Sequence, residues 1–213
     1  MKIYSIHFNR PDFVSIQNQC CKKIGYNLVV VNNGGNEDIH KACDQEGVEE
    51  IKTKNIGTNS FSHGNSINQL FKIAPNPETC GIIDHDLFLE KPIDFKSNNI
   101  IAYKQSRGDF SYFWPGFLFW KKDVPMKKID FTPNSIGDTG ANTNAIFNDL
   151  NSKINFIKEQ HEDNNTIQSD GYSKFYLNDE LVAIHAINGS NWHSAFSESK
   201  TKTLNDLLHN ILK

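Results

Sequence analysis

The first 90 residues repeat one pattern, a short apolar run followed by apolar residues three or four positions apart. Apolar runs predict strands, and the wider spacing predicts amphipathic helices. The run from Leu28 to Val31 is continuous, which is typical of a strand buried on both faces of a parallel sheet. The predicted strands are residues 2–8, 27–33, 48–53 and 80–83, and the predicted helices carry Phe13, Ile16, Cys20 and Ile24, then Ile39, Ala42 and Cys43, then Ile67, Leu70 and Phe71.

Three strand–helix units in succession favour an α/β fold with a mostly parallel central sheet, flanked by helices and joined by right-handed crossovers. Residues 55–65 are polar and include glycine, so we expect a loop before the third helix. After Pro92 the pattern changes, and we expect a smaller, mixed part. This part contains predicted strands at 99–104, 110–120 and 181–186, a polar loop at 137–144, and helices at about 141–150 and 195–213.

The composition is that of a globular protein, with 38% hydrophobic and 22% charged residues among 213. Lys plus Arg is 22 and Asp plus Glu is 25, so the net charge of −3 excludes binding driven by neutralisation of a nucleic-acid backbone. The four cysteines form no C-x-x-C pair, so we expect buried thiols in a reducing compartment. We find neither a membrane-spanning apolar run nor a signal peptide, and we therefore expect a cytoplasmic protein.

The sharpest chemical signal is Asp84-His85-Asp86, which directly follows the apolar residues 81–83. Ligands of open α/β sheets bind at the carboxyl ends of the strands. Two carboxylates crowded at such an edge repel each other unless a cation lies between them, and hard oxygen ligands suit Mg²⁺ or Mn²⁺. The alternative is a pair of carboxylates that only caps the next turn.

Phosphatases that form an aspartyl-phosphate also use two aspartates one residue apart. Theirs follow the first strand, with a hydroxyl or β-branched residue two positions further on. Here the pair follows the fourth predicted strand and position 88 is Phe. The pattern therefore excludes that class of enzyme.

Together with three later segments, the aspartate motif resembles the GT-A class of nucleotide-sugar glycosyltransferases. Residues 113–119 (Phe-Trp-Pro-Gly-Phe-Leu-Phe) resemble the family's segment in which a small glycine begins a strand behind the donor sugar. Residues 137–140 (Gly-Asp-Thr-Gly) resemble its acidic loop, which faces the donor sugar and the acceptor. His185 to Trp192 is similar to a late His-x-x-Gly…Trp element, although Gly189 follows four residues after His185 rather than three, and Ser190-Asn191 replaces a frequent Lys-Pro.

The resemblance implies a single GT-A-like (Rossmann-like) catalytic domain over residues 1–213, with a nucleotide-binding half at about 1–90 and a donor-sugar and acceptor half at about 91–213. It implies a metal-dependent glycosyltransferase of the hexosyltransferase type, which transfers a sugar from a UDP-sugar to a glycan or glycoprotein acceptor. A virus-encoded enzyme that glycosylates a capsid protein is one candidate within this class. The alternatives are another nucleotide-using α/β enzyme, such as a nucleotidyltransferase, and a non-catalytic sugar-binding module.

The resemblance also implies roles for four of these residues. Asp86 would bind Mn²⁺ or Mg²⁺ directly, Asp84 would hold the donor ribose or a metal-bound water, and His185 would be a further metal ligand, with His193 as a competing candidate. Asp138 would be the general base of an inverting enzyme, or would hold donor hydroxyls in a retaining one. Alternatively, His185 is a core histidine bonded to the backbone, and Asp138 only caps the helix that follows it.

The donor nucleotide should lie over the ends of the early strands. Phe8, Asn9 and Arg10 follow the first predicted strand and Asn32 lies at the end of the second, so a base could stack and form amide hydrogen bonds there. Ordinary turn chemistry is the alternative for each of these residues.

A diphosphate suits the free N–H groups at the start of a helix. His63 and Asn65 are expected at the start of the third helix, and the resemblance places Gly189 against the diphosphate as well. In the aromatic run 110–120, core packing is the default, but Trp114, like the later Trp192, is a candidate to contact a sugar.

Overall fold

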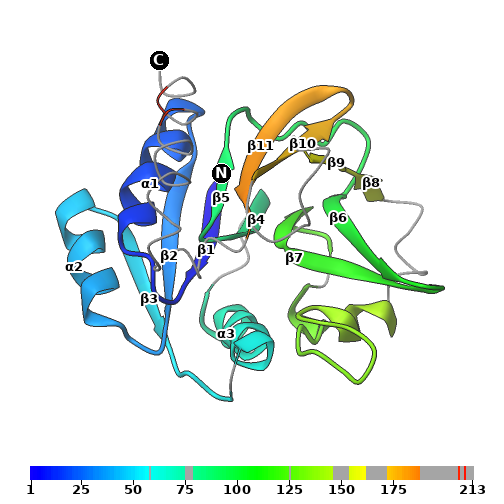
Figure 1. Ribbon diagram of the computed structural model, residues 1–213, viewed down its shortest axis with the longest axis horizontal. Helices are drawn as coiled ribbons and strands as arrows, with labels where there is room; N and C mark the ends of the chain where they lie inside the picture. The colour runs from blue at the N-terminus through cyan, green and yellow to red at the C-terminus, as the bar shows by residue number, and fades with distance from the viewer. Residues whose placement is uncertain are drawn as a thin grey trace.

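A computed structural model describes residues 1–57, 59–74, 79–124, 126–145, 154–161, 172–187, 206 and 209 of the chain. In these residues the strands form two sheets (Figure 1). The larger sheet has seven strands in the order β3-β2-β1-β4-β7-β6-β8, and the smaller has four in the order β5-β11-β10-β9. The elements are β1 (Lys2–His7), α1 (Asp12–Lys23), β2 (Asn27–Asn33), α2 (Glu37–Glu46), β3 (Glu49–Thr53), α3 (Asn59–Ile73), β4 (Thr79–Asp84), β5 (Leu87–Leu89), β6 (Ile100–Arg107), β7 (Phe110–Lys121), the 3₁₀ helices η1 (Met126–Lys128) and η2 (Ala141–Thr143), β8 (Ile154–Phe156), β9 (Lys158–His161), β10 (Tyr172–Leu177) and β11 (Glu180–Ala186).

Strands β3, β2, β1 and β4 run parallel, as the strand–helix pattern predicts. Lys2 of β1 lies opposite Asn27 of β2 on one side and Cys80 of β4 on the other. β7 and β6 continue the sheet in antiparallel pairs, and β8 pairs parallel with β6. The expected α/β class, with a mostly parallel central sheet and a smaller mixed part, is therefore confirmed.

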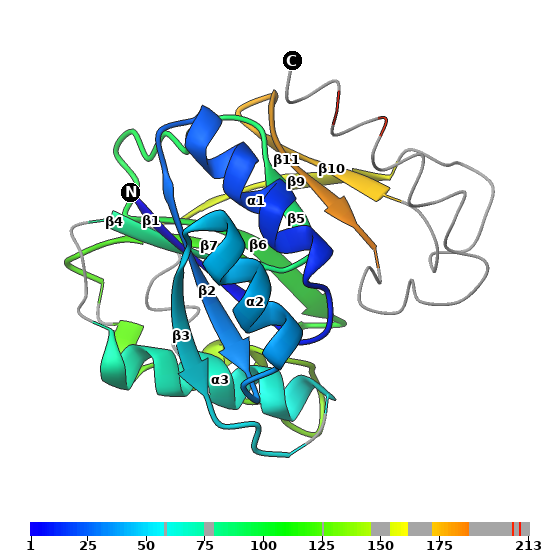
Figure 2. The same cartoon turned by 90° about the vertical axis from the view of Figure 1, so that its left-hand side faces the viewer.

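Helices cover both faces of the parallel strands, with α1 and α2 together on one face and α3 on the other (Figure 2). Alternate side chains of β2 show this division. Leu28 and Val30 are buried in the cluster that includes side chains of α1 and α2, whereas Val29 and Val31 are buried in the cluster that includes side chains of α3. The run is continuously apolar because both faces of this strand are covered by helices.

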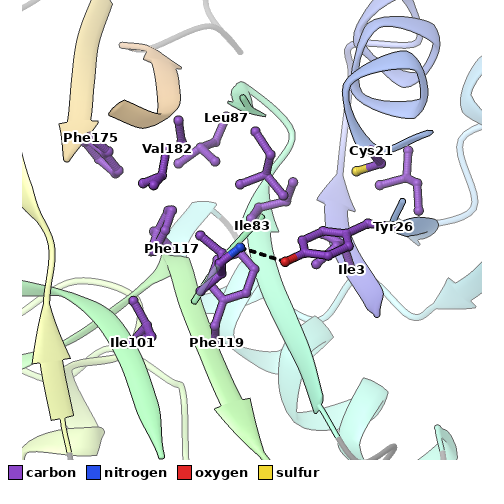
Figure 3. Close-up of a cluster of buried hydrophobic side chains, with 14 of the residues drawn as sticks. Ile3, Cys21, Tyr26, Ile83, Leu87, Ile101, Phe117, Phe119, Phe175 and Val182 are labelled. Atoms are coloured by element: carbon purple, nitrogen blue, oxygen red, sulfur yellow. Dashed lines mark hydrogen bonds between the residues drawn. The ribbon is translucent and has the colours of Figure 1, made fainter. Parts of the chain in front are cut away.

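One buried cluster also joins the two sheets (Figure 3). Ile83 and Phe117 belong to the larger sheet, and Phe175 and Val182 belong to the smaller one. The ring centroids of Phe117 and Phe175 are 5.7 Å apart. This apolar contact holds the smaller sheet against the larger one. It therefore also fixes the position of the β5–β11 pair relative to β4.

The loop expected at residues 55–65 is wrong in its second half, because α3 already begins at Asn59. This polar segment forms a helix because its side chains find partners on the sheet. The Asn33 side chain donates to the Ser62 hydroxyl at 3.1 Å, and the hydroxyls of Thr53 and Ser66 are 2.5 Å apart. A Cβ at Gly64 would lie 2.3 Å from the carbonyl oxygen of Phe131, so only glycine allows α3 to pack this closely.

Strands β5, β8, β9 and β10 are not anticipated by the sequence pattern. β5 and β8 have three residues each, too few for a period to show. In β10 the buried side chains include the polar Ser173, whereas Tyr172 and Lys174 are only partly buried. A buried serine interrupts the alternation of apolar and polar residues from which a half-buried strand is recognised.

Two predicted helices are tested only in part. The helix expected at about 141–150 begins as the 3₁₀ helix η2 and continues as α-helix at 144 and 145, and the rest of it lies outside the described residues. Of the helix expected at 195–213, the structure describes only Asp206 and His209, both helical. The four cysteines are free and buried, as expected. No helix among the described residues is both long and apolar enough to span a membrane.

Candidate active site

The aspartate motif lies at the turn where the chain leaves the larger sheet for the smaller one. Asp84 is the last residue of β4, His85 and Asp86 form the turn, and β5 begins at Leu87. β4 pairs with β1 in the larger sheet, whereas β5 pairs with β11 in the smaller one. The motif is therefore at the carboxyl end of a central parallel strand, where ligands of α/β sheets bind.

The pairing of β5 with β11 brings Asp86 and His185 together. His185 lies opposite Leu87, and the backbone N–H of Ala186 donates to the carbonyl oxygen of Asp86 at 2.8 Å. Nε2 of His185 is 3.6 Å from Oδ1 of Asp86, and the two side chains are 14% and 8% exposed. Sequence reasoning predicted both residues as metal ligands, and the structure places them side by side.

The charges of this pair shift both pKa values. Burial raises the pKa of Asp86, but His85 and His185 outweigh burial and hold the pKa of this carboxyl well below its usual range. Burial lowers the pKa of His185, but Asp86 outweighs it and the pKa of this imidazole is raised. A buried carboxylate next to a histidine is a site at which a divalent cation can bind in place of a proton.

Asp84 is paired differently from Asp86. Nε2 of His63, on α3, lies 3.2 Å from Oδ1 of Asp84, which is an ion-pair distance without hydrogen-bond geometry. Burial lowers the pKa of His63, but Asp84, Asp138 and Asp86 together raise it above its usual value. α3 begins at Asn59, so His63 lies in the second turn of the helix rather than at its start, where the sequence predicted it.

The residues fit a divalent cation in part. Among the described residues, no group of three His, Cys, Asp or Glu side chains is arranged to hold a metal ion. However, Oδ1 of Asp84 and Nδ1 of His185 are buried and have no hydrogen-bond partner among the described residues. Nδ1 of His185 thus makes no hydrogen bond to the backbone of the described residues. Two ligand atoms of one cation lie about 3 Å apart. The 3.6 Å between Nε2 of His185 and Oδ1 of Asp86 is close to this distance.

Asp138 lies on an exposed loop that is fixed to α3 and β7. Its backbone N–H donates to the Tyr112 hydroxyl at 3.1 Å, and the Thr139 hydroxyl donates to the carbonyl oxygen of Ser60 at 2.9 Å. The N-cap of η2 is Gly140, no side chain caps this helix, and the Asp138 carboxylate accepts a hydrogen bond from the N–H of Thr139. The alternative, in which Asp138 only caps this helix, is therefore not supported.

Gly140 anchors the same loop against β7. Its φ of +89° is in the left-handed region, and a Cβ at this position would lie 2.2 Å from the carbonyl oxygen of Phe113. Only glycine satisfies both conditions. Asp138 thus lies on a short, tightly packed loop. Its carboxylate is near enough to His63 to raise the pKa of that imidazole.

The candidate nucleotide-binding residues lie along the same sheet edge as Asp84. Ile6 lies opposite Asp84, and His7 lies opposite Asn32, so the ends of β1, β2 and β4 are adjacent. Phe8, directly after β1, is 50% exposed and is available to stack on a base. Asn9 follows it and is partly buried.

Several of these residues already have partners within the chain. The Arg10 guanidinium is buried, bonds both carboxylate oxygens of Asp12 and lies 3.6 Å from the centroid of the Phe13 ring. The amide of Asn32 donates to the carbonyl oxygen of Asn36 at 2.8 Å and to the Glu50 carboxylate at 2.7 Å.

Asn65 donates to the carbonyl oxygen of Phe61 at 3.0 Å, within α3. Trp114 is partly buried, and its ring centroid lies 5.1 Å from that of His185. Its predicted contact with a sugar stays a prediction. Gly189, Trp192 and the competing ligand His193 lie outside the described residues.

Sequence reasoning missed two buried polar residues next to the motif, His7 and Gln17. The Gln17 side chain donates to the carbonyl oxygens of Asp84 and Leu87, and its Oε1 is 2.9 Å from Nε2 of His7. A signal was present, since Gln17 is an amide on the apolar face that Phe13, Cys20 and Cys21 form on α1. Which partner it binds is visible only in the fold, because these contacts span 10 to 70 residues.

The stability of the fold should depend on pH through His7. Burial lowers the pKa of His7 from 6.5 to about 3, with His85 adding to the shift. Between these values the unfolded chain binds a proton that the folded chain does not, so stability falls as pH falls. The loss due to His7 should be about 2 kcal/mol at pH 5. Urea unfolding of wild type and His7→Asn at pH 7 and pH 5 would measure it, and parallel pH dependences would contradict it.

Comparisons with known proteins find similarity in structure alone, since no protein-family model and no curated protein sequence matches the chain. The glycosyltransferase GlyE of Streptococcus pneumoniae TIGR4 is 11% identical, over 74% of this chain and 45% of that one, with a TM-score of 0.44. Glucosyl-3-phosphoglycerate synthase of Mycobacterium tuberculosis, in complex with Mn²⁺ and UDP-glucose, is 10% identical over 73% of this chain and 67% of that one, with a TM-score of 0.48. TarS 1–349 of S. aureus is 12% identical over 73% and 57%, with a TM-score of 0.48.

This chain spans less than half of the GlyE structure and 57% of TarS 1–349. At such identities and TM-scores, the similarity carries no argument about the activity of this chain. The α/β class with a mostly parallel central sheet rests on the order and direction of the chain's own strands, and the function has to be inferred from the chain's own residues.

Proposed function

We propose that the chain is a metal-dependent glycosyltransferase of the hexosyltransferase type, which transfers a sugar from a UDP-sugar to a hydroxyl of a glycan or glycoprotein. The observation that carries this proposal is the meeting of Asp86 and His185, 3.6 Å apart at the carboxyl end of β4, beside an Asp84 oxygen without a hydrogen-bond donor in the described residues. Carboxylate oxygens suit Mg²⁺ and Mn²⁺, and an imidazole ligand favours the transition ion, Mn²⁺.

Asp86 and His185 would hold the cation, and Asp84 would hold a metal-bound water or the donor ribose. The cation would stabilise the negative charge that develops on the leaving diphosphate. The exposed Phe8 and the neighbouring ends of β1 and β2 would receive the nucleoside, which corresponds to a nucleotide-binding half at about 1–90. We place the enzyme in the cytoplasm, in keeping with its free cysteines.

Asp138 would act on the sugar side of the site. Its carboxylate is exposed on a loop packed against α3 and β7, so an acceptor hydroxyl can reach it from solvent. In an inverting reaction it would accept the proton of that hydroxyl, and in a retaining reaction it would hold donor hydroxyls. The half at about 91–213 would then bind the donor sugar and the acceptor.

Calorimetric titration of the protein with UDP would test the proposal. Binding with Mn²⁺ present should be at least about tenfold tighter than binding in EDTA, because the cation joins the diphosphate to the protein. Titration with UMP, which lacks the β-phosphate, is the control and should depend far less on Mn²⁺. UDP binding that is identical with Mn²⁺ and with EDTA would contradict metal dependence, and absence of any nucleotide binding would leave the sugar-binding module as the better interpretation.

A further inference from the structure

The apolar face of α1 contains one buried amide, Gln17. It is 1% exposed and shares that face with Phe13, Cys20 and Cys21. A buried amide without partners would destabilise the fold, because its polar atoms lose their hydrogen bonds to water. Gln17 therefore needs hydrogen-bond partners, and it finds them in the aspartate turn.

The Gln17 amide nitrogen spans the turn from one end to the other. Nε2 donates to the carbonyl oxygen of Asp84 at 2.8 Å and to that of Leu87 at 2.7 Å. Because both donor hydrogens point to carbonyl oxygens, the orientation of the amide is determined and Oε1 is an acceptor. Nε2 of His7 lies 2.9 Å from this Oε1, so His7 carries its proton on Nε2 and donates it to Gln17.

The turn is held from its other side by β11. The N–H of Ala186 donates to the carbonyl oxygen of Asp86 at 2.8 Å. The carbonyl oxygens of Asp84, Asp86 and Leu87 are thus all bonded, two by Gln17 and one by β11. The backbone from which both carboxylates project is fixed relative to α1 and relative to the smaller sheet.

We propose that Gln17 is a positioning residue for the cation and diphosphate site, with His7 as the residue that orients it. The proposal rests on the function proposed above, since it assigns Gln17 to the same site. Gln17 contacts no ligand itself. By bonding the backbone on both sides of the motif, it holds the Asp84 and Asp86 carboxylates in one arrangement before a cation binds, which lowers the ordering cost of binding.

A purely structural role for Gln17, attachment of α1 to the sheet, is the competing explanation. Asn18 provides a matched control for it. Asn18 is the next residue of α1, is 4% exposed, and its amide donates to the carbonyl oxygen of Glu46 at 3.3 Å and to the Glu46 carboxylate at 3.2 Å, at the end of α2. It is a buried amide on the same helix whose hydrogen bonds go to α2 and not to the turn.

The test compares Gln17→Met with Asn18→Met in two measurements. In the metal-free protein, amide hydrogen exchange in a peptide covering residues 84–89 should be at least about tenfold faster in Gln17→Met than in wild type, and unchanged in Asn18→Met. With UDP present, the dissociation constant of Mn²⁺, followed by the electron spin resonance of the free ion, should rise about tenfold in Gln17→Met alone. Both variants should lower the thermal midpoint by similar amounts.

Equal changes in turn exchange and Mn²⁺ affinity in the two variants would overturn the proposal in favour of a structural role, and so would a Gln17→Met protein that behaves as wild type. A wild-type protein that binds no Mn²⁺ would overturn the proposed function and the positioning role with it, whereas the exchange data would still show whether Gln17 holds the turn. If Gln17→Met does not fold, Gln17→Asn serves instead. Its polar group is one methylene shorter and cannot bond both carbonyl oxygens, so the same two measurements apply.

Discussion

Replacing Asp86 with Asn should abolish Mn²⁺-dependent binding of UDP and lower the transfer rate by about 10³-fold, or ~4 kcal/mol of transition-state stabilisation. The substitution keeps the shape of the side chain and removes the negative charge next to His185. Affinity for the cation should fall by at least about a hundredfold, because a direct ligand contributes more than the 10–100-fold of residues that only orient ligands. Calorimetry with UDP and Mn²⁺ and a radiolabelled-sugar transfer assay would measure the two effects.

The control for this substitution is Asp44→Asn. Asp44 is an exposed carboxylate that lies 3.6 Å from His40, the same distance that separates Asp86 from His185, but on α2, away from the motif. Its loss should change neither UDP binding nor turnover. An Asp86→Asn protein that retains Mn²⁺-dependent UDP binding would contradict the assignment of Asp86 as a metal ligand.

Replacing Asp138 with Asn should lower turnover by about 10²–10⁴-fold if Asp138 is the general base, with little change in UDP binding. The loop should keep its shape, because Oδ1 of Asn can still accept the hydrogen bond from the Thr139 N–H. A loss in kcat with an unchanged dissociation constant for UDP would separate a role in the chemical step from a role in nucleotide binding.

Asp109→Asn, an exposed aspartate in the turn between β6 and β7, is the control and should have wild-type turnover. The anomeric configuration of the product, read by NMR, distinguishes the two roles considered for Asp138. Inversion agrees with a general base, and retention agrees with a residue that holds donor hydroxyls. Full activity of Asp138→Asn would show that the catalytic assignment is wrong.

The first half of the fold, at about residues 1–90, could be predicted from the sequence because its signals are local. The strand at 27–33 matches β2 at both ends, the strands at 2–8 and 48–53 differ from β1 and β3 by one residue at one end, and the strand at 80–83 is one residue shorter than β4 at each end. These strands lie between helices, so their apolar runs are continuous and easy to recognise. The motif at 84–86 was found for the same reason, since it directly follows such a run.

The smaller sheet could not be predicted in the same way. β5 is a three-residue strand whose partner, β11, lies almost 100 residues later, and β10 has a serine on its buried face. A prediction from periodicity uses only the residues of one segment. These strands, in contrast, are stabilised by the distant strands with which they pair. The early start of α3 has the same cause, because Ser62 and Ser66 bond residues of β2 and β3.

The sequence by itself determined the α/β class, the parallel strands of the first half and the position of two aspartates at the end of a buried strand. Only the tertiary structure decided their partners. It paired Asp86 with His185 through the register of β5 and β11, placed His63 against Asp84, and brought Gln17 to the backbone of the turn. The physical reason is that hydrophobic periodicity records which face of an element is buried, but not which distant polar group it meets there.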